Sequence, residues 1–221
     1  MSDLPGVAAV GLWNAGQASY AISDAIANPD KVLFEIGSIT KVFTGLLVAQ
    51  AVESGALSID DSIEKLMAGH AVVSRTVAPV TLRQLLTHSA CFPAMPSDFG
   101  ANVTFDKEWA AYDRAKLWAA LKDLQLQSTP PCKAAYSNFG IAVVGELLAQ
   151  RDKKAWAQLV NERILQPLGM TDTIVSQPEK EPRLAPSFSA YAPAPSLHFN
   201  AFASTGGLRS TAADLLIFAE R

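Results

Sequence analysis

Residues 34–47, FEIGSITKVFTGLL, pass from a short strand-like run directly into the pattern of a long apolar helix. After Ser38 the apolar residues recur every three or four positions, which predicts a helix, and Gly55 is typical of the residue that ends one. Serine is a favoured helix cap, so an ordinary helix start accounts for Ser38. It does not account for Lys41, which has to lie beside that serine and close to an apolar surface.

Ser38 and Lys41 give the first indication of chemistry, because residues three apart share one face of a helix. Their Oγ and Nζ atoms can therefore come within hydrogen-bonding distance. A serine hydroxyl becomes a good nucleophile when a base removes its proton, and lysine can be that base if burial or nearby charge lowers its pKa. The helix start adds N–H groups that favour a developing oxyanion. On its own, the S-x-x-K pattern also arises by chance.

The segment YSNFG places Tyr136 and Asn138 at the start of a second long helix. A phenol there can share a proton with a lysine ammonium, and a carboxamide offers a donor and an acceptor to a substrate amide. The alternative interpretation is an ordinary serine or asparagine helix cap with a core tyrosine beside it.

The remaining pattern has strands first and helices afterwards. GVAAVGLW and QASYAI, separated by NAG, predict a β-hairpin. Further helices are expected from a capping box at Thr81, over residues 107–124, and over residues 139–165 with a split near Asp152. Residues 181–200 are rich in Pro, Ser and Ala and predict an extended surface passage.

The last residues, STAADLLIFAER, begin another helix at Thr211, and the sequence stops about two turns later. A lone hairpin is marginal in water without a third strand or covering helices. We therefore interpret the start and the end of the sequence as parts of one sheet domain whose remainder is absent.

Composition excludes several classes of protein. The chain has 221 residues, 49% of them hydrophobic and 18% charged, which is enough for one large domain or two modest ones. Its net charge of −3, with scattered Lys and Arg, argues against nucleic-acid binding. No apolar run approaches the roughly 18 residues that span a membrane. We predict no signal peptide in MSDLPGVAAV, and localisation stays open between the cytoplasm and, if a leader was removed, the periplasm or exterior.

The two cysteines, Cys91 and Cys132, are expected to be unpaired thiols, with a disulfide between them as the alternative. No His, Cys, Asp or Glu residues have the spacing of zinc ligands, and TGGLRS lacks the lysine of a phosphate loop. We therefore expect neither a metal nor another cofactor. His88 is interpreted as fixing a helix end beside the site, not as a member of a catalytic triad.

Together these segments make the sequence resemble the serine β-lactamase and penicillin-binding-protein superfamily, most of all its class C branch, which also contains D,D-peptidases and esterases. S-x-x-K is the nucleophile motif of that superfamily. The resemblance extends from about Gly6 to Phe218. It is carried, in the family's order, by FEIGSITK, VTLRQLLTHSACFP, PPCKAAYSNFGIAVVGELL, ILQPLGMTDT and GGLRSTAADLLIF.

The resemblance implies an α+β fold of the β-lactamase/transpeptidase type, with an all-helical domain inserted into a mixed α/β sheet domain that is incomplete here. Residues 1–60 would be the first part of the α/β domain with the nucleophile helix. Residues 61–200 would form the mainly helical domain, and residues 201–221 would return toward the α/β domain.

The same resemblance implies roles for four residues. Ser38 would be the acylated nucleophile and Lys41 its proton acceptor. Tyr136 would be the partner in proton transfer, and Asn138 would bind the substrate amide carbonyl and Lys41. No metal or organic cofactor is implied.

The sequence also departs from the family pattern. The third motif, Lys-Thr-Gly or His-Thr-Gly on an edge strand, is missing, and STGG at residues 204–207 is not a substitute for it. That strand supplies an oxyanion-hole donor, and losing one such donor costs roughly 100- to 1000-fold in rate. Cys91 and Cys132 occupy loop positions where relatives usually carry glycine, so they could narrow the mouth of the site or pair.

The resemblance therefore implies a serine hydrolase that opens a β-lactam amide through an acyl-enzyme. The substrate would be a small-molecule or peptidoglycan-derived acyl compound. The alternatives are a carboxylesterase or D,D-peptidase of the same fold, a penicillin-binding domain without turnover, and an inactive fragment. Such a fragment would self-associate or need a complementing C-terminal segment.

Overall fold

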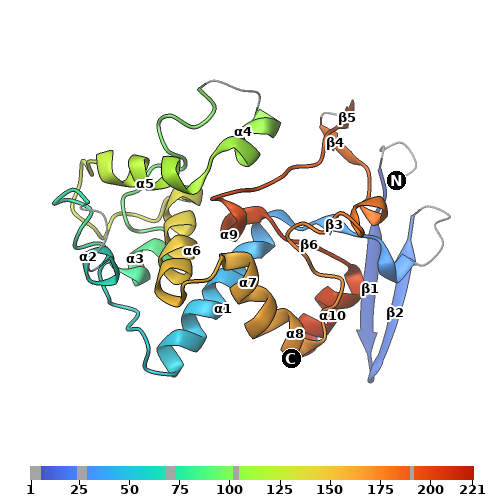
Figure 1. Cartoon of the computed structure of the whole chain (residues 1–221). Coiled ribbons are helices and arrows are strands. Elements are labelled where there is room, and N and C mark those ends of the chain that lie inside the picture. The colour runs from blue at the N-terminus through green and yellow to red at the C-terminus, as the bar shows by residue number, and fades with distance from the viewer. Residues whose placement is uncertain (1–5, 24–28, 68–72, 102–104, 190–191) are drawn as a thin grey trace.

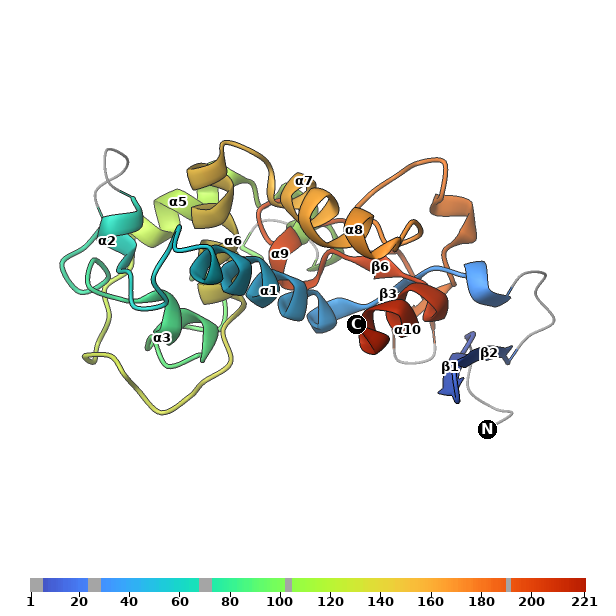
Figure 2. The same ribbon diagram turned by 90° about the horizontal axis from the view of Figure 1, so that it is seen from below.

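The computed structural model describes residues 6–23, 29–67, 73–101, 105–189 and 192–221. Figure 1 shows most helices gathered on one side and a β-hairpin on the other, with the long helix that follows Ser38, labelled α1 (Thr40–Glu53), among the helices. Figure 2, seen from below, shows the C-terminal helix next to this hairpin. Among the described residues, no helix is long and apolar enough to cross a membrane.

The strands are short, and most of the regular structure is helical. The strands are β1 (Ala9–Asn14), β2 (Gln17–Ile22), β3 (Phe34–Glu35), β4 (Ser187–Ser189), β5 (Ala192–Ala194) and β6 (Arg209–Ser210). The α-helices are α1 (Thr40–Glu53), α2 (Ile63–Leu66), α3 (Leu82–Leu86), α4 (Phe105–Ala111), α5 (Arg114–Asp123), α6 (Asn138–Asp152), α7 (Trp156–Val160), α8 (Gln166–Leu168), α9 (Ala203–Gly206) and α10 (Ala212–Glu220). Other helical turns are η1 (Pro29–Lys31), η2 (Gly37–Ile39), η3 (Asn161–Leu165) and η4 (Glu181–Arg183).

The predicted hairpin is confirmed, since β1 and β2 pair antiparallel from Ala9 opposite Ile22 to Asn14 opposite Gln17. Helix α10 covers one face of it. A Cβ atom at Gly11 would lie 2.9 Å from Leu216 Cδ1, so a residue without a side chain allows this close packing. On the other face, Val10 and Leu12 are 52% and 62% exposed.

The short strand-like run before Ser38 is present as β3, and its partner comes from the other end of the sequence. Phe34 pairs with Ser210 and Glu35 with Arg209 in an antiparallel register. This pairing brings residues 209 and 210 beside the segment that leads into α1, as Figure 1 shows.

Of three longer patterns, one was predicted correctly and two only in part. The pattern over residues 107–124 is interrupted, because the Asp113 side chain accepts the Lys116 N–H at 2.9 Å and starts α5 as a new helix. The pattern over residues 139–165 splits after Asp152, as expected, where Lys153 adopts a left-handed φ of 54°. The passage at residues 181–200 is not simply extended, since it contains η4 and the paired strands β4 and β5.

Helix α6 lies at the centre of the helical region, and its residues 139–145 and 147–149 are all buried. It contacts α1, α3, α5, α7 and α9. Because apolar residues lie on every side of it, α6 is a helix of the core and not an amphipathic surface helix. Its first residue, Asn138, follows directly from the segment that carries Tyr136.

Asp172 joins three distant parts of the chain. Its carboxylate accepts hydrogen bonds from Arg183 Nη1 at 2.8 Å and from Lys31 Nζ at 2.9 Å. The hydrogen bond from Arg183, opposed by burial and supported by the one from Lys31, lowers the pKa of Asp172 from 3.8 to about 2. The ionised carboxylate therefore stabilises the fold above pH 3.8, and this contribution is lost as the pH falls toward 2.

Asp172→Asn is expected to lower the free energy of unfolding at neutral pH by about 1–3 kcal/mol, because Lys31, Arg183 and the more distant Lys180 lose their shared carboxylate. The variant should also lose part of the stability change that the wild type shows between about pH 4 and pH 2. Urea unfolding curves across that range measure both effects. Parallel curves for the two proteins, with equal midpoints at neutral pH, would contradict the assignment.

Candidate active site

Ser38 lies in the turn η2, between β3 and α1, and its side chain is exposed. Its Oγ is 2.6 Å from the Tyr136 hydroxyl and 3.1 Å from Lys41 Nζ. The residue at the cap position of α1 is Ile39, and no side chain caps this helix. The serine is therefore not a helix cap, and its hydroxyl contacts Lys41, which the spacing predicted, and Tyr136, which the resemblance implied.

Lys41 is half-buried in the first turn of α1. Its Nζ donates to Ser38 Oγ at 3.1 Å and to the main-chain oxygen of Thr205 at 2.6 Å. Burial lowers the pKa of Lys41, opposed by its hydrogen bond and charge interaction with Tyr136. A neutral amine in this place can still donate one N–H to the Thr205 carbonyl while its lone pair faces the serine hydroxyl. This is the geometry that a base needs.

Tyr136 is held by the turn that follows α3. Its ring lies 4.8 Å from the His88 ring and 4.8 Å from Lys41 Nζ. The main-chain N–H groups of Ala135 and Ser137 bond to His88, the first to its oxygen at 2.9 Å and the second to Nδ1 at 3.2 Å. Burial, and then the charge of Lys41, lower the pKa of His88, which favours the neutral ring that can accept at Nδ1. His88 thus supports the tyrosine segment, in line with its expected place beside the site.

The two cysteines form a disulfide, so the expectation of two unpaired thiols was wrong. Cys91 and Cys132 have Cα atoms 5.4 Å apart, and the Cys132 N–H also bonds to the Ser89 oxygen at 2.9 Å. Connectivity is not readable from spacing alone, and only the folded chain brings these two loops together. The bond ties the turn after α3 to the segment that leads to Tyr136.

Cys132→Ser is expected to lower the free energy of unfolding by about 2–4 kcal/mol, since the disulfide closes a long loop in the unfolded chain. Any Ser38 reactivity should fall by less than about tenfold, because the two hydrogen bonds to His88 still hold the tyrosine segment. Urea unfolding with and without reductant measures the stability. If reductant leaves the wild-type midpoint unchanged, the disulfide does not form in solution.

Asn138 is brought close to this cluster, but its side chain contacts a different group. Its main-chain N–H donates to the Ala94 oxygen at 3.0 Å, and its Nδ2 is 3.6 Å from Met95 Sδ. The neighbouring Ser137 caps α6, because its Oγ accepts the Gly140 N–H at 2.9 Å. Within the described residues, Lys41 Nζ donates to Ser38 and Thr205 and also interacts with Tyr136, and none of these contacts involves the expected Asn138.

Sequence reasoning missed Thr205. Its contribution to the site is a main-chain carbonyl, and every residue type has one, so no side-chain signature identifies it. The only sequence signal is the adjacent pair Gly206 and Gly207, which permits close backbone approach. A Cβ at Gly206 would lie 3.3 Å from Phe199 Cζ and 3.8 Å from the Gly37 carbonyl carbon.

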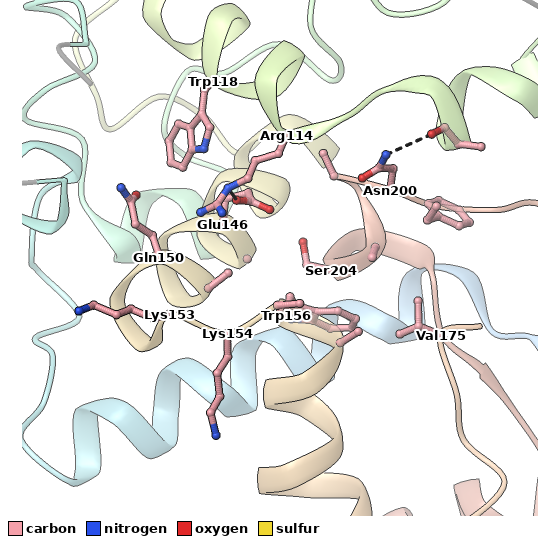
Figure 3. A pocket seen from close by; sticks show the side chains of 18 residues that line it. Arg114, Trp118, Glu146, Gln150, Lys153, Lys154, Trp156, Val175, Asn200 and Ser204 are labelled. Atoms are coloured by element: carbon pink, nitrogen blue, oxygen red, sulfur yellow. Dashed lines mark hydrogen bonds and ion pairs between the residues drawn. The ribbon is translucent and has the colours of Figure 1, made fainter. Parts of the chain in front are cut away.

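No group of three His, Cys, Asp or Glu residues in the described ranges could hold a metal ion. A separate cavity of about 930 Å³ lies between α5, α6, the start of α7 and residues 199–204 (Figure 3). Figure 3 shows Arg114 and Glu146 facing one another there, and their Nε and Oε2 atoms are 2.5 Å apart. Burial raises the pKa of Glu146, opposed by Arg114. Ser204, next to Thr205, forms part of the cavity wall.

Comparison with known proteins places this cluster in context. The sequence model of the family described as Beta-lactamase matches residues 2–221. The chain is 28% identical over 183 residues to the D-alanyl-D-alanine-carboxypeptidase/endopeptidase AmpH of Escherichia coli K12, covering 82% of this chain and 46% of that protein. It is 28% identical over 139 residues to penicillin-binding protein 4 of Amycolatopsis lactamdurans, covering 62% of this chain and 35% of that protein. The chain thus spans less than half the length of these relatives.

Solved structures show the same fold. D-alanine carboxypeptidase AmpC from Burkholderia cenocepacia matches 98% of this chain with a TM-score of 0.79 and 26% identity, over 58% of its own length. Class C beta lactamase from Rhodobacter sphaeroides matches 99% with a TM-score of 0.78 and 24% identity, over 60% of its own length. The expected α+β fold of the β-lactamase/transpeptidase type is therefore confirmed.

Proposed function

Because this chain belongs to the beta-lactamase family, we propose that it is a serine hydrolase whose nucleophile is Ser38. One observation carries the proposal. Ser38 Oγ lies within hydrogen-bonding distance of both Lys41 Nζ, at 3.1 Å, and the Tyr136 hydroxyl, at 2.6 Å. A serine between a half-buried amine and a phenol has a base to activate it and a second group to move the proton onward.

In the proposed acylation, neutral Lys41 accepts the Ser38 proton while Oγ forms a bond to the substrate carbonyl carbon. The carbonyl electron pair moves to oxygen, and the N-terminal end of α1 favours that negative charge. The proton then passes through the Tyr136 hydroxyl to the leaving nitrogen as the bond between that nitrogen and the carbonyl carbon breaks. A water molecule afterwards attacks the acyl ester, gives its proton to the same pair and regenerates the serine.

Asn138 is proposed to bind the substrate amide carbonyl through its Nδ2. The amide is half-buried at the first residue of α6 and points at Met95 Sδ, 3.6 Å away. A thioether sulfur is a weak acceptor, so exchanging it for a carbonyl oxygen costs little. The position of Asn138, two residues after Tyr136, whose hydroxyl lies 2.6 Å from Ser38 Oγ, supports this role.

The proposed substrate is a β-lactam amide, with short-chain esters and D-amino-acid peptides as the alternatives. The printed names of the relatives include a beta-lactamase, a penicillin-binding protein and D-alanine carboxypeptidases. One scaffold hosts all of these reactions, so fold alone does not rank them. The three differ in how fast water removes the acyl group.

The experiment that tests the proposal is intact-protein mass after incubation with a penicillin and, separately, with a fluorophosphonate. The expected result is one adduct per chain, mapped to Ser38 by peptide sequencing. Turnover of a chromogenic cephalosporin, a nitrophenyl ester and an acyl-D-Ala-D-Ala peptide then ranks the substrates. A burst equal to the protein concentration without a steady state would indicate a binding domain without turnover. No adduct with either reagent would contradict the proposal for this chain.

A further inference from the structure

The short helix α9 supplies two consecutive carbonyl groups to the nucleophile helix. Thr44 Oγ1 donates to the Ser204 oxygen at 2.7 Å, and Lys41 Nζ donates to the Thr205 oxygen at 2.6 Å. Ser204 and Thr205 are both 2% exposed. The position of α9 therefore fixes where the acceptor for the Lys41 amine lies.

On its other side, α9 packs against α6, and Gly145 lies at this contact. A Cβ atom at Gly145 would lie 2.3 Å from Ser204 Oγ and 2.4 Å from Ser204 Cβ, distances that real Cβ atoms do not show. Ser204 Oγ also donates to the Ile141 oxygen of α6 at 3.4 Å. Figure 3 shows the Ser204 side chain projecting from α9 into the space beside α6. The absent side chain at position 145 sets how close the two helices come.

The contact between Gly145 and Ser204 borders the cavity. Gly145, Ala203 and Ser204 all line the space of about 930 Å³, so one flank of α9 is not covered by packed side chains. A Cβ added at position 145 would have to displace Ser204, and with it α9, from its present place beside α6. The displaced element would carry the Thr205 carbonyl with it.

We propose that Gly145 and Ser204 are positioning residues for Lys41, acting through the Thr205 carbonyl. Their contact holds α9 where this carbonyl takes one N–H of the amine and leaves the lone pair directed at Ser38. The inference rests on the proposed role of Lys41 as the base. It can nevertheless be tested without any reaction, because the pKa of Lys41 can be measured in the resting protein.

The test compares Gly145→Ala with the wild type by two readouts. The first is the pKa of Lys41, followed by NMR of protein carrying ¹³C at the lysine Cε. The second is the rate of fluorophosphonate labelling at Ser38 against pH. The other titratable groups facing Lys41 are Tyr136 and His88, so the Lys41 resonance is assigned with Lys41→Arg.

The hydrogen bond from Lys41 Nζ to the Thr205 oxygen is already short, at 2.6 Å, so a movement of α9 should lengthen or bend it. A carbonyl acceptor stabilises the ammonium more than the neutral amine, so weakening this bond lowers the pKa of Lys41. Gly145→Ala should therefore lower the Lys41 pKa by about 0.5–1 unit. The labelling rate at high pH should fall about 10- to 100-fold, since the lone pair is no longer aimed at the serine.

Two further variants separate this effect from general damage. Gly145→Ala combined with Ser204→Gly removes the clash, so its Lys41 pKa should lie within about 0.5 unit, and its labelling rate within about threefold, of those of Ser204→Gly alone. Gly45→Ala makes the same change in α1, where an added Cβ meets nothing within 4 Å, and should leave both readouts unchanged.

A folded Gly145→Ala protein in which Lys41 has the wild-type pKa overturns the inference. If Gly145→Ala does not fold, Ser204→Gly alone decides, because opening the contact should lower the Lys41 pKa in the same direction. An unlabelled wild type counts against the proposed function only, since the NMR titration still measures the coupling between Gly145 and Lys41.

Discussion

Ser38→Ala is expected to abolish covalent labelling by penicillin and fluorophosphonate, with a loss in rate of about a thousandfold or more. The reason is chemical, because alanine has no oxygen with which to form the acyl bond. The fold should be preserved, since the Ser38 side chain is exposed and its hydroxyl bonds only to Tyr136 and Lys41 among the described residues. The change in unfolding free energy should stay within about 1 kcal/mol.

Ser54→Ala is the matched control. Ser54 lies at the other end of α1, is also exposed, and its hydroxyl donates to the Ala51 oxygen at 3.1 Å. Its removal should leave labelling unchanged. One adduct per chain on the Ser38→Ala protein would mean that a different residue is the nucleophile, and peptide mapping would identify it.

Lys41→Ala is expected to lower the labelling rate about 100- to 10,000-fold, the usual range for a general base. Burial lowers the pKa of Lys41 below 10.5, so the wild-type rate should rise with pH as this amine loses its proton, before an ordinary lysine would. Only the deprotonated amine can accept the Ser38 proton, so the labelling rate falls as the pH drops below the Lys41 pKa. The Lys41→Ala protein should lack that rise.

Two companion variants make the lysine result specific. Lys41→Arg keeps a positive charge but cannot accept a proton near neutral pH, so it should not restore the rate. Lys122→Ala removes an exposed lysine of α5 and should have no effect. Normal labelling of either Lys41 variant would exclude this lysine as the base.

Local patterns predicted the elements that depend on local forces. The hairpin and the helix start at Thr81 follow from turn and cap residues, and both are present. The contact between Ser38 and Lys41 follows from helical spacing alone. The helix start at Asp113 was missed, although a helix cap is a local feature. An aspartate inside a helical pattern is equally compatible with a surface position in one helix and with the cap of a new one.

The parts that could not be predicted depend on long-range contacts. Tyr136 comes to Ser38 from 98 residues away, and only resemblance to a family indicated it. The Cys91–Cys132 disulfide depends on two loops meeting, which spacing does not report. The Thr205 carbonyl belongs to the backbone and is invisible to any argument from side chains.

The burial of α6 on every side limits how such a site can change over generations. Its residues 139–145 and 147–149 have no solvent-facing position where a substitution is free of packing cost. Few substitutions inside this helix could therefore change substrate preference without also destabilising the fold. Accepted changes should accumulate at its mouth, in the loops near Met95 and Tyr136, where exposure permits variation and the reacting atoms are still within reach. The buried helix should therefore tolerate substitution least, and the two loops joined by the disulfide should tolerate it most.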